Sequence, residues 1–227
     1  MNRESIGREF WRGLRVFIFD LDGTLIDSKL DLALSVNATR EKFGLGSLAH
    51  EIIFDYIGDG APMLVRRALD HTEDDALVAE ALPFFLTYYR EHMLDNTVLY
   101  PGVREALDQL ATGGRVLTVL TNKPERFSKL ILEGLGVAPR FRLVYGGNTF
   151  ERKKPDPIGV DAILRETGAT KEQALLVGDS EIDVQTARNA GVRVVGVSYG
   201  LGSERLKEHP PDWMVGSLTE LAALMRI

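Results

Sequence analysis

Residues 16–25 read Val16-Phe17-Ile18-Phe19-Asp20-Leu21-Asp22-Gly23-Thr24-Leu25. The stretch opens with an unbroken apolar run, which is typical of a strand that is buried on both faces. Two aspartates, a glycine and a threonine follow this run. In an open parallel sheet, ligands bind at the carboxyl ends of the strands. The sequence therefore predicts a strand that delivers acidic side chains to a binding edge, whereas the alternative interpretation is a plain Asp-Gly turn.

Composition narrows the class of protein. The chain has 227 residues and a formal net charge of −6, and it contains no cysteine. An acidic chain without a basic run is not expected to bind nucleic acid. No apolar run approaches the roughly 20 residues that span a bilayer, so no membrane partner is expected. The lack of cysteine excludes disulfides, zinc-thiolate sites and a cysteine nucleophile. No signal peptide is recognisable, and the expected location is the cytoplasm.

Strands and helices alternate along most of the chain, and one long helical stretch interrupts them. Buried strands are expected at residues 14–20, 115–120, 141–145, 174–177 and 193–197, with a short one at 213–215. This alternation predicts an α/β fold with right-handed βαβ units, a mostly parallel sheet and a Rossmann-like three-layer core. Residues 1–28 and 98–227 form the expected core, and residues 29–97 form an inserted all-helical cap domain. Within the cap, the helix expected at 73–94 is broken or restarted at Pro83.

Polar groups follow several of these strands at their carboxyl ends. Because those ends share one edge of a parallel sheet, the loops are expected to converge. The groups are Asp20, Asp22 and Thr24; Thr121 and Asn122; Lys154; and Asp179 with Asp183. Carboxylates that meet in one place repel each other, and oxygen ligands favour Mg²⁺ over zinc. A divalent metal, a lysine and short hydrogen-bond donors together indicate a phosphate site.

The nucleophile is expected among the carboxylates, because the chain has no cysteine and no plausible Ser-His-Asp arrangement. An aspartate can attack phosphorus and form an aspartyl-phosphate. A second aspartate two residues further on can protonate the leaving oxygen and later accept a proton from water.

With these motifs in order, the chain resembles the haloacid dehalogenase superfamily, in its phosphatase branch with a helical cap of the C1 type. The match spans about residues 16–197. The resemblance implies that Asp20 is the nucleophile and a Mg²⁺ ligand. It also implies that Asp22 is the general acid and base and binds the metal through its backbone carbonyl. Asp179 is then the third protein ligand, and Asp183 holds a metal-bound water or the site lysine.

The same resemblance assigns the phosphate-binding residues. Thr121, Asn122 and Lys154 are expected to bind the transferring phosphoryl group. Lys153 is the adjacent alternative to Lys154 for this role, but Lys154, the residue directly before Pro155, occupies the family position. An aspartate at position 22 favours the phosphate-ester branch over the carbon–halogen, phosphonate and ion-pumping branches.

The cap points to a substrate. The stretch 57–69 and the pair Gly146-Gly147 are similar to those of phosphoglycolate phosphatases. A Gly-x-Gly loop at Gly58 and Gly60 permits close approach of a small ligand, and Arg67 can attract a carboxylate. The alternative is that the glycines only start a helix and that the arginine is solvated.

The expected activity is hydrolysis of a small phosphorylated metabolite, preferably 2-phosphoglycolate, by a monomer or homodimer. The alternatives are a phosphosugar mutase similar to β-phosphoglucomutase and a sugar-phosphate phosphatase of broad specificity. A non-enzymatic binding protein is disfavoured, because it has no reason to maintain the repulsion among these carboxylates.

Overall fold

A six-stranded sheet forms the centre of the computed structural model, which describes residues 8–225. Its order is β5-β4-β1-β6-β7-β8, and every neighbouring pair is parallel. The strands are β1 (Val16–Phe19), β4 (Val116–Leu120), β5 (Phe141–Tyr145), β6 (Ala174–Gly178), β7 (Arg193–Val197) and β8 (Trp213–Val215). The expected α/β fold with a mostly parallel sheet is confirmed, and the remaining residues, 1–7 and 226–227, lie outside the described range.

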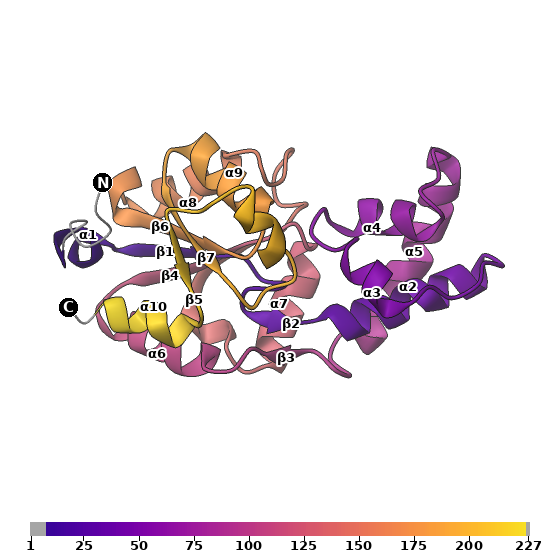
Figure 1. Cartoon of the computed structure of the whole chain (residues 1–227), viewed down its shortest axis with the longest axis horizontal. Coiled ribbons are helices and arrows are strands. Elements are labelled where there is room, and N and C mark those ends of the chain that lie inside the picture. The colour runs from indigo at the N-terminus through magenta and orange to yellow at the C-terminus, as the bar shows by residue number, and fades with distance from the viewer. Residues whose placement is uncertain (1–7, 226–227) are drawn as a thin grey trace.

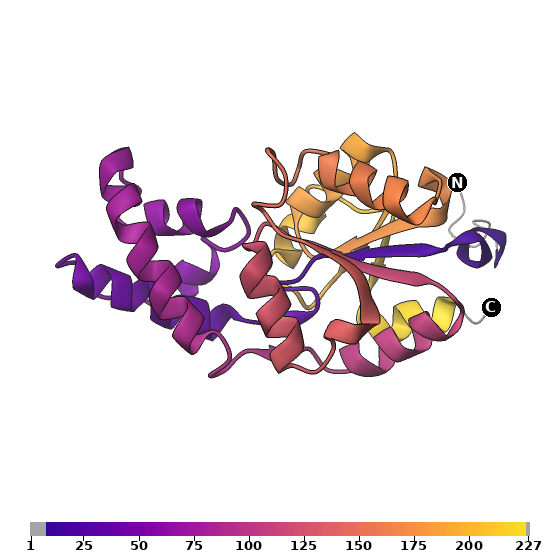
Figure 2. The same ribbon diagram turned by 180° about the vertical axis from the view of Figure 1, so that it is seen from behind.

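Helices cover both faces of this sheet, as Figures 1 and 2 show from opposite sides. Alternate residues of β1 point to opposite faces, so Phe17 and Phe19 join one apolar cluster while Val16 and Ile18 join the other. The first cluster includes side chains of α6 (Val103–Thr112), α7 (Glu125–Gly134) and α10 (Leu218–Leu224). The second includes side chains of α8 (Ile158–Thr167) and α9 (Glu181–Ala190). The core therefore has the expected three layers.

Shorter elements complete the core. Helix α1 (Arg8–Gly13) lies beside β8, where Phe10 stacks on Trp213 with ring centroids 4.9 Å apart. Among the described residues, three short 3₁₀ helices occur in the connections, at Ala138–Arg140, Lys171–Gln173 and Ser203–Lys207. None of the described helices is both long enough and apolar enough to cross a lipid bilayer.

The strand register brings three loops to the same level. Phe19 at the end of β1 is the register partner of Val119 in β4 and of Val177 in β6. The residues that follow these strands therefore emerge side by side at one edge of the sheet. Asp20 is the first residue after β1, and Asp179 is the first after β6.

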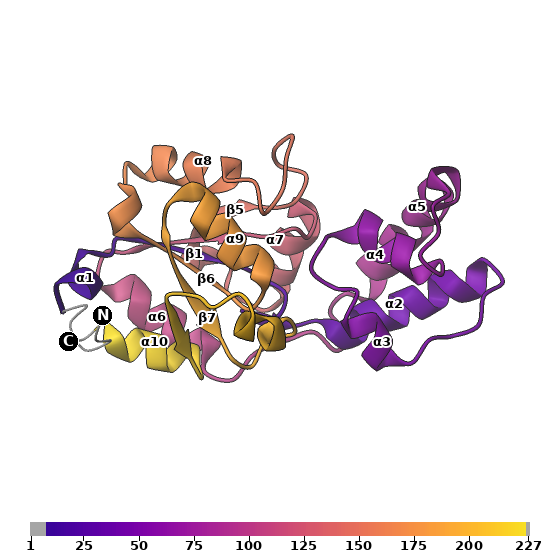
Figure 3. The ribbon, with the colours of Figure 1, turned by 45° about the horizontal axis from the view of Figure 1, so that its top comes forward.

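The helical segment lies beyond this edge, at one end of the molecule in Figures 1 and 3. It contains α2 (Lys29–Lys42), α3 (His50–Phe54), α4 (Ala61–Ala68) and α5 (Asp75–His92). These helices share an apolar cluster that includes Val36, Ile53, Leu64 and Phe85. The expected break at Pro83 is wrong, because α5 runs through this residue. Buried Ala81 and Phe85 flank Pro83 and hold the helix in place where one backbone hydrogen bond is lost.

The chain enters and leaves the helical segment through a two-stranded antiparallel pair, β2 (Ile26–Asp27) and β3 (Val98–Leu99). Beside this pair, the buried carboxylate of Asp31 in α2 accepts hydrogen bonds from Asn96 and Thr97. The backbone N–H of Asn96 lies 3.0 Å from either carboxylate oxygen, and the N–H and Oγ1 of Thr97 lie 2.8 and 2.7 Å from Oδ2. Asp31 thus ties the outgoing chain to the returning chain. The domain boundaries expected at residues 28 and 98 fall here and stay a prediction.

We expect Asp31→Ala to lower the free energy of unfolding by about 3 kcal/mol, because several buried donors lose a charged acceptor. Urea unfolding measures this change. The matched control is Asp75→Ala, which removes an exposed carboxylate paired with Arg66 and should cost less than about 1 kcal/mol. Equal effects of the two substitutions would contradict the role assigned to Asp31.

Candidate functional site

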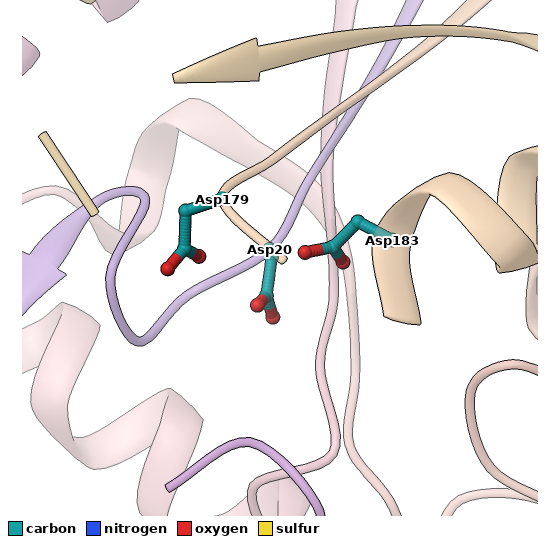
Figure 4. A group of neighbouring side chains, drawn as sticks. All are labelled: Asp20, Asp179 and Asp183. Atoms are coloured by element: carbon teal, nitrogen blue, oxygen red, sulfur yellow. The ribbon is translucent and has the colours of Figure 1, made fainter. Parts of the chain in front are cut away.

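Three carboxylates meet at the carboxyl edge of the sheet. Asp20 follows β1, Asp179 follows β6, and Asp183 lies in the first turn of α9. One carboxylate oxygen from each lies within 4.8 Å of the other two, and Figure 4 shows the three side chains facing a common space. The structure thus brings together three of the acidic residues that the sequence singled out.

Two glycines make room for Asp179. A Cβ atom at Gly23 would lie 2.3 Å from Oδ2 of Asp179, and one at Gly200 would lie 2.1 Å from its Cβ. Gly23 also has a φ of +85°, which disfavours any other residue. The oxygens of Asp179 accept hydrogen bonds from Thr24 Oγ1 at 3.0 Å and from the backbone N–H of Gly202 at 2.9 Å. These contacts fix the carboxylate in the cluster.

Lys154 supplies the positive charge beside this cluster. Its Nζ lies 2.8 Å from Oδ1 of Asp20 and 2.7 Å from Oδ1 of Asp183. The other oxygen of Asp183 accepts hydrogen bonds from the backbone N–H of Ser180 at 3.1 Å and from its hydroxyl at 2.6 Å. Asp183 therefore contacts the site lysine, which is one of the two roles expected for it.

One ammonium does not balance three clustered carboxylates. Burial raises the pKa of Asp20 to about 6, although the nearby charge of Lys154 opposes the shift. Burial also raises the pKa of Asp179 to about 8, and the charges of Asp183 and Asp20 add to the effect. A cation placed among these oxygens would relieve the repulsion, so the residues present fit a divalent metal ion with oxygen ligands. Asp20 and Asp179 are the carboxylates available to hold it.

Asp22 faces a different set of partners. Its two oxygens lie 2.9 and 3.0 Å from Nζ of Lys123, and Oδ1 also accepts a hydrogen bond from the hydroxyl of Ser28. Ser28 precedes α2 as its N-cap, but its hydroxyl makes no capping bond. Asp22 is thus held at the point where the chain leaves the sheet for the helical segment.

The sequence interpretation missed Lys123. Its side chain is 4% exposed, and its ammonium lies 4.7 Å from the centroid of the Tyr89 ring in α5. Burial alone would lower the pKa of Lys123, but the carboxylate of Asp22 and the Tyr89 side chain together more than offset this and raise it. The one available signal was its position directly after Thr121 and Asn122.

Thr121 and Asn122 follow β4 and line the same cavity as Asp20. The Thr121 Oγ1 accepts a hydrogen bond from the backbone N–H of Lys123 at 3.3 Å. The side-chain amide of Asn122 donates to the carbonyls of Gly58 and Lys154, at 3.1 and 3.2 Å. Its Oδ1 is buried and has no hydrogen-bond partner among residues 8–225. Asn122 therefore joins the sheet to the loop ahead of α4.

This loop approaches the sheet closely. A Cβ at Gly60 would lie 2.9 Å from the carbonyl oxygen of Asn122, and Gly60 has a φ of +84°. Gly58 and Gly60 both line the cavity. Arg67 instead donates hydrogen bonds to the carbonyl of Tyr56 at 2.8 Å and to Asp59 at 2.6 Å. The structure thus places the two glycines at the cavity, and Arg67 braces the loop behind them.

Comparisons with known proteins agree with this geometry. Residues 17–197 match the profile of the family described as "Haloacid dehalogenase-like hydrolase". A protein of Pseudomonas putida named phosphoglycolate phosphatase is 42% identical over 214 residues, which cover 91% of this chain and 78% of the relative. One of Colwellia psychrerythraea with the same name is 37% identical over 91% of this chain and 94% of the relative. A crystal structure of a "predicted phosphoglycolate phosphatase" from Haemophilus somnus superposes with a TM-score of 0.89 at 31% identity, covering 93% of this chain and 98% of that one.

We expect MgCl₂ to raise the melting temperature relative to EDTA, and to raise it more at pH 8 than at pH 6. The pKa values of about 6 for Asp20 and about 8 for Asp179 mean that protons occupy these carboxyls as the pH falls. The metal must then displace protons, so its apparent affinity declines. Thermal unfolding at both pH values measures the effect.

The matched pair of variants for this test is Asp179→Asn and Asp161→Asn. The first removes a carboxylate from the cluster and should abolish most of the MgCl₂ effect. The second changes an exposed carboxylate in the first turn of α8 and should leave it intact. An undiminished response in Asp179→Asn would remove this residue from the metal site.

Proposed function

Because the chain belongs to the haloacid dehalogenase-like hydrolase family, we propose that it is a Mg²⁺-dependent phosphatase that acts through an aspartyl-phosphate on Asp20. The observation that carries the proposal is the contact of Lys154 with both Asp20 and Asp183, beside a third buried carboxylate. This arrangement concentrates positive charge at a carboxylate that would otherwise repel a phosphate dianion.

Asp20 and Asp22, the two aspartates that follow β1, have different roles in the proposed reaction. A carboxylate oxygen of Asp20 attacks phosphorus, and the bond between phosphorus and the ester oxygen breaks. The carboxyl group of Asp22 gives its proton to the departing alkoxide. Water then attacks the phosphoryl group on Asp20, and Asp22 accepts a proton from this water. Inorganic phosphate is released and free Asp20 is regenerated.

The remaining residues hold the phosphoryl group. Lys154 neutralises negative charge on its oxygens, and Thr121 offers its hydroxyl as a donor from the neighbouring strand end. The side-chain amide of Asn122 already donates to Gly58 and Lys154, so Asn122 would contribute its backbone N–H. Asp20, Asp179 and the backbone carbonyl of Asp22 would hold Mg²⁺, which would supply charge stabilisation there. Asp183 acts by holding Lys154 in place.

The names of the relatives support 2-phosphoglycolate as the preferred substrate. The cavity supports it too, because its lining beyond Asp20 and Thr121 includes the apolar side chains of Leu64 and Phe85 from the helical segment. Such a lining leaves few groups to hydrogen-bond the hydroxyls of a sugar. A monomeric or homodimeric state and a cytoplasmic location remain part of the proposal.

We expect Asp20→Asn to lower phosphate release by at least about 10³-fold, because it removes the nucleophile. The control is Asp156→Asn, two residues after Lys154, which alters a carboxylate that accepts from the backbone N–H of Ile158 at 3.0 Å. It should keep near-normal activity. Colorimetric phosphate release from 2-phosphoglycolate with MgCl₂ measures both, and full turnover by Asp20→Asn would disprove the mechanism.

A substrate panel separates the phosphatase from the mutase. We expect steady phosphate release from 2-phosphoglycolate without any sugar bisphosphate, and much slower release from hexose phosphates. A mutase would instead interconvert sugar phosphates, need a bisphosphate primer and release little phosphate. Comparable rates across all phosphate esters would favour a sugar-phosphate phosphatase of broad specificity.

A further inference from the structure

The cavity at the carboxyl edge of the sheet has one basic side chain in its lining, within the part of the chain that the structure describes. That side chain is Lys123, and the acidic members of the lining are Asp20 and Asp22. A negatively charged group of a ligand would be repelled by both aspartates unless it lay against Lys123. The charge pattern of the cavity therefore marks one place for a second anionic group besides the phosphate.

The ammonium of Lys123 can donate a hydrogen bond to such an anionic group. Its ammonium carries three N–H donors, and its contacts at 2.9 and 3.0 Å involve the two oxygens of a single carboxylate, Asp22. Even if each contact occupies one donor, only the Tyr89 hydroxyl, among the described residues, competes with a ligand for the third. The side chain is 4% exposed, so an anion that reaches it meets a charge little screened by water.

Tyr89 provides a second, independent observation. The residue is 1% exposed and lines the same cavity, and its ring lies beside the ammonium of Lys123. Its hydroxyl is buried and makes no hydrogen bond of normal geometry among the described residues, where the Lys123 ammonium is its polar neighbour. Buried hydroxyls are nearly always paired, so a ligand oxygen beside Lys123 would complete the arrangement.

We infer that Lys123, with the hydroxyl of Tyr89 beside it, binds a carboxylate on the leaving group and so selects phosphate esters of 2-hydroxy acids. The inference rests on the proposed function. In such an ester the carboxylate carbon is two bonds from the ester oxygen that Asp22 protonates. Lys123 contacts Asp22 directly, so its ammonium lies next to the place that the ligand carboxylate would occupy.

The other candidate cations are engaged elsewhere. Arg67 bonds the carbonyl of Tyr56 and the carboxylate of Asp59. Lys154 lies between Asp20 and Asp183. The structure thus favours Lys123 for carboxylate recognition over Arg67 of α4, which the sequence had suggested for this role.

The test compares 2-phosphoglycolate with 2-hydroxyethyl phosphate, which has the same two-carbon chain but no carboxylate. The readout is the ratio of their kcat/KM values. We expect the wild-type protein to favour phosphoglycolate strongly and Lys123→Met to lower the ratio by about 100-fold or more, because a buried charge pair is lost. Lys123→Arg should recover part of the ratio. Tyr89→Phe, which keeps the ring and removes the hydroxyl, should lower it by about tenfold.

Two further variants make the result specific. Lys129→Met alters an exposed lysine of α7 paired with Glu125 and should leave the ratio unchanged. Arg67→Met tests the other cation that the sequence suggested for carboxylate binding. If Lys123→Met slows both esters equally, or if the ratio collapses only in Arg67→Met, the inference is overturned while the phosphatase proposal stands. If the wild-type protein hydrolyses both esters equally well, the proposed substrate and the inference are both wrong.

Discussion

The ammonium of Lys154 sits 2.8 Å from Asp20 and 2.7 Å from Asp183, and the geometry of the site depends on this bridge. Three carboxylates within 4.8 Å of each other, two of them buried and one partly buried, are costly to keep ionised. The lysine compensates one of these charges, yet the pKa values of Asp20 and Asp179 still rise. The residual negative charge is what suits the site to a metal ion, and in the proposed mechanism the same lysine faces the phosphate. On that proposal, one side chain serves both the assembly of the site and its chemistry.

The fold imposes this proximity before any side-chain contact forms. Strand β1 lies between β4 and β6, and the ends of the three lie within one residue of each other in register. Asp20 and Asp179 therefore emerge from adjacent strands at the same edge of the sheet. Glycines at positions 23 and 200 then admit the carboxylate of Asp179, since a Cβ at either position would overlap it. Backbone geometry thus sets the distance between the carboxylates, and hydrogen bonds from Thr24 and Gly202 fix their direction.

Strand ends were predictable from the sequence because apolar runs and the polar residues after them are local patterns. The convergence of Asp20, Asp179 and Lys154 follows from the parallel sheet that these patterns predict. Lys123 was not predictable, because its contact with Asp22 depends on the direction of a side chain in a loop. The pair β2 and β3 was also missed, since each strand has only two residues and leaves no periodic pattern. Pro83 misled for the opposite reason: a strong local signal is overridden by packing on both sides.

If the proposed function and the role inferred for Lys123 hold, residues 121–123 join recognition of the substrate to positioning of the helical segment. Asn122 donates to the carbonyls of Gly58 and Lys154, and Lys123 lies between Asp22 and the ring of Tyr89. A ligand that pairs with Lys123 therefore meets groups of the sheet and of α5 at once. The approach of Gly60 to Asn122 has the same consequence, because any displacement of that loop changes the surroundings of Asn122. On the proposed function, substrate binding and the position of the helical segment are coupled through three consecutive residues, and selectivity arises at the same loop that would present Thr121 to the phosphate.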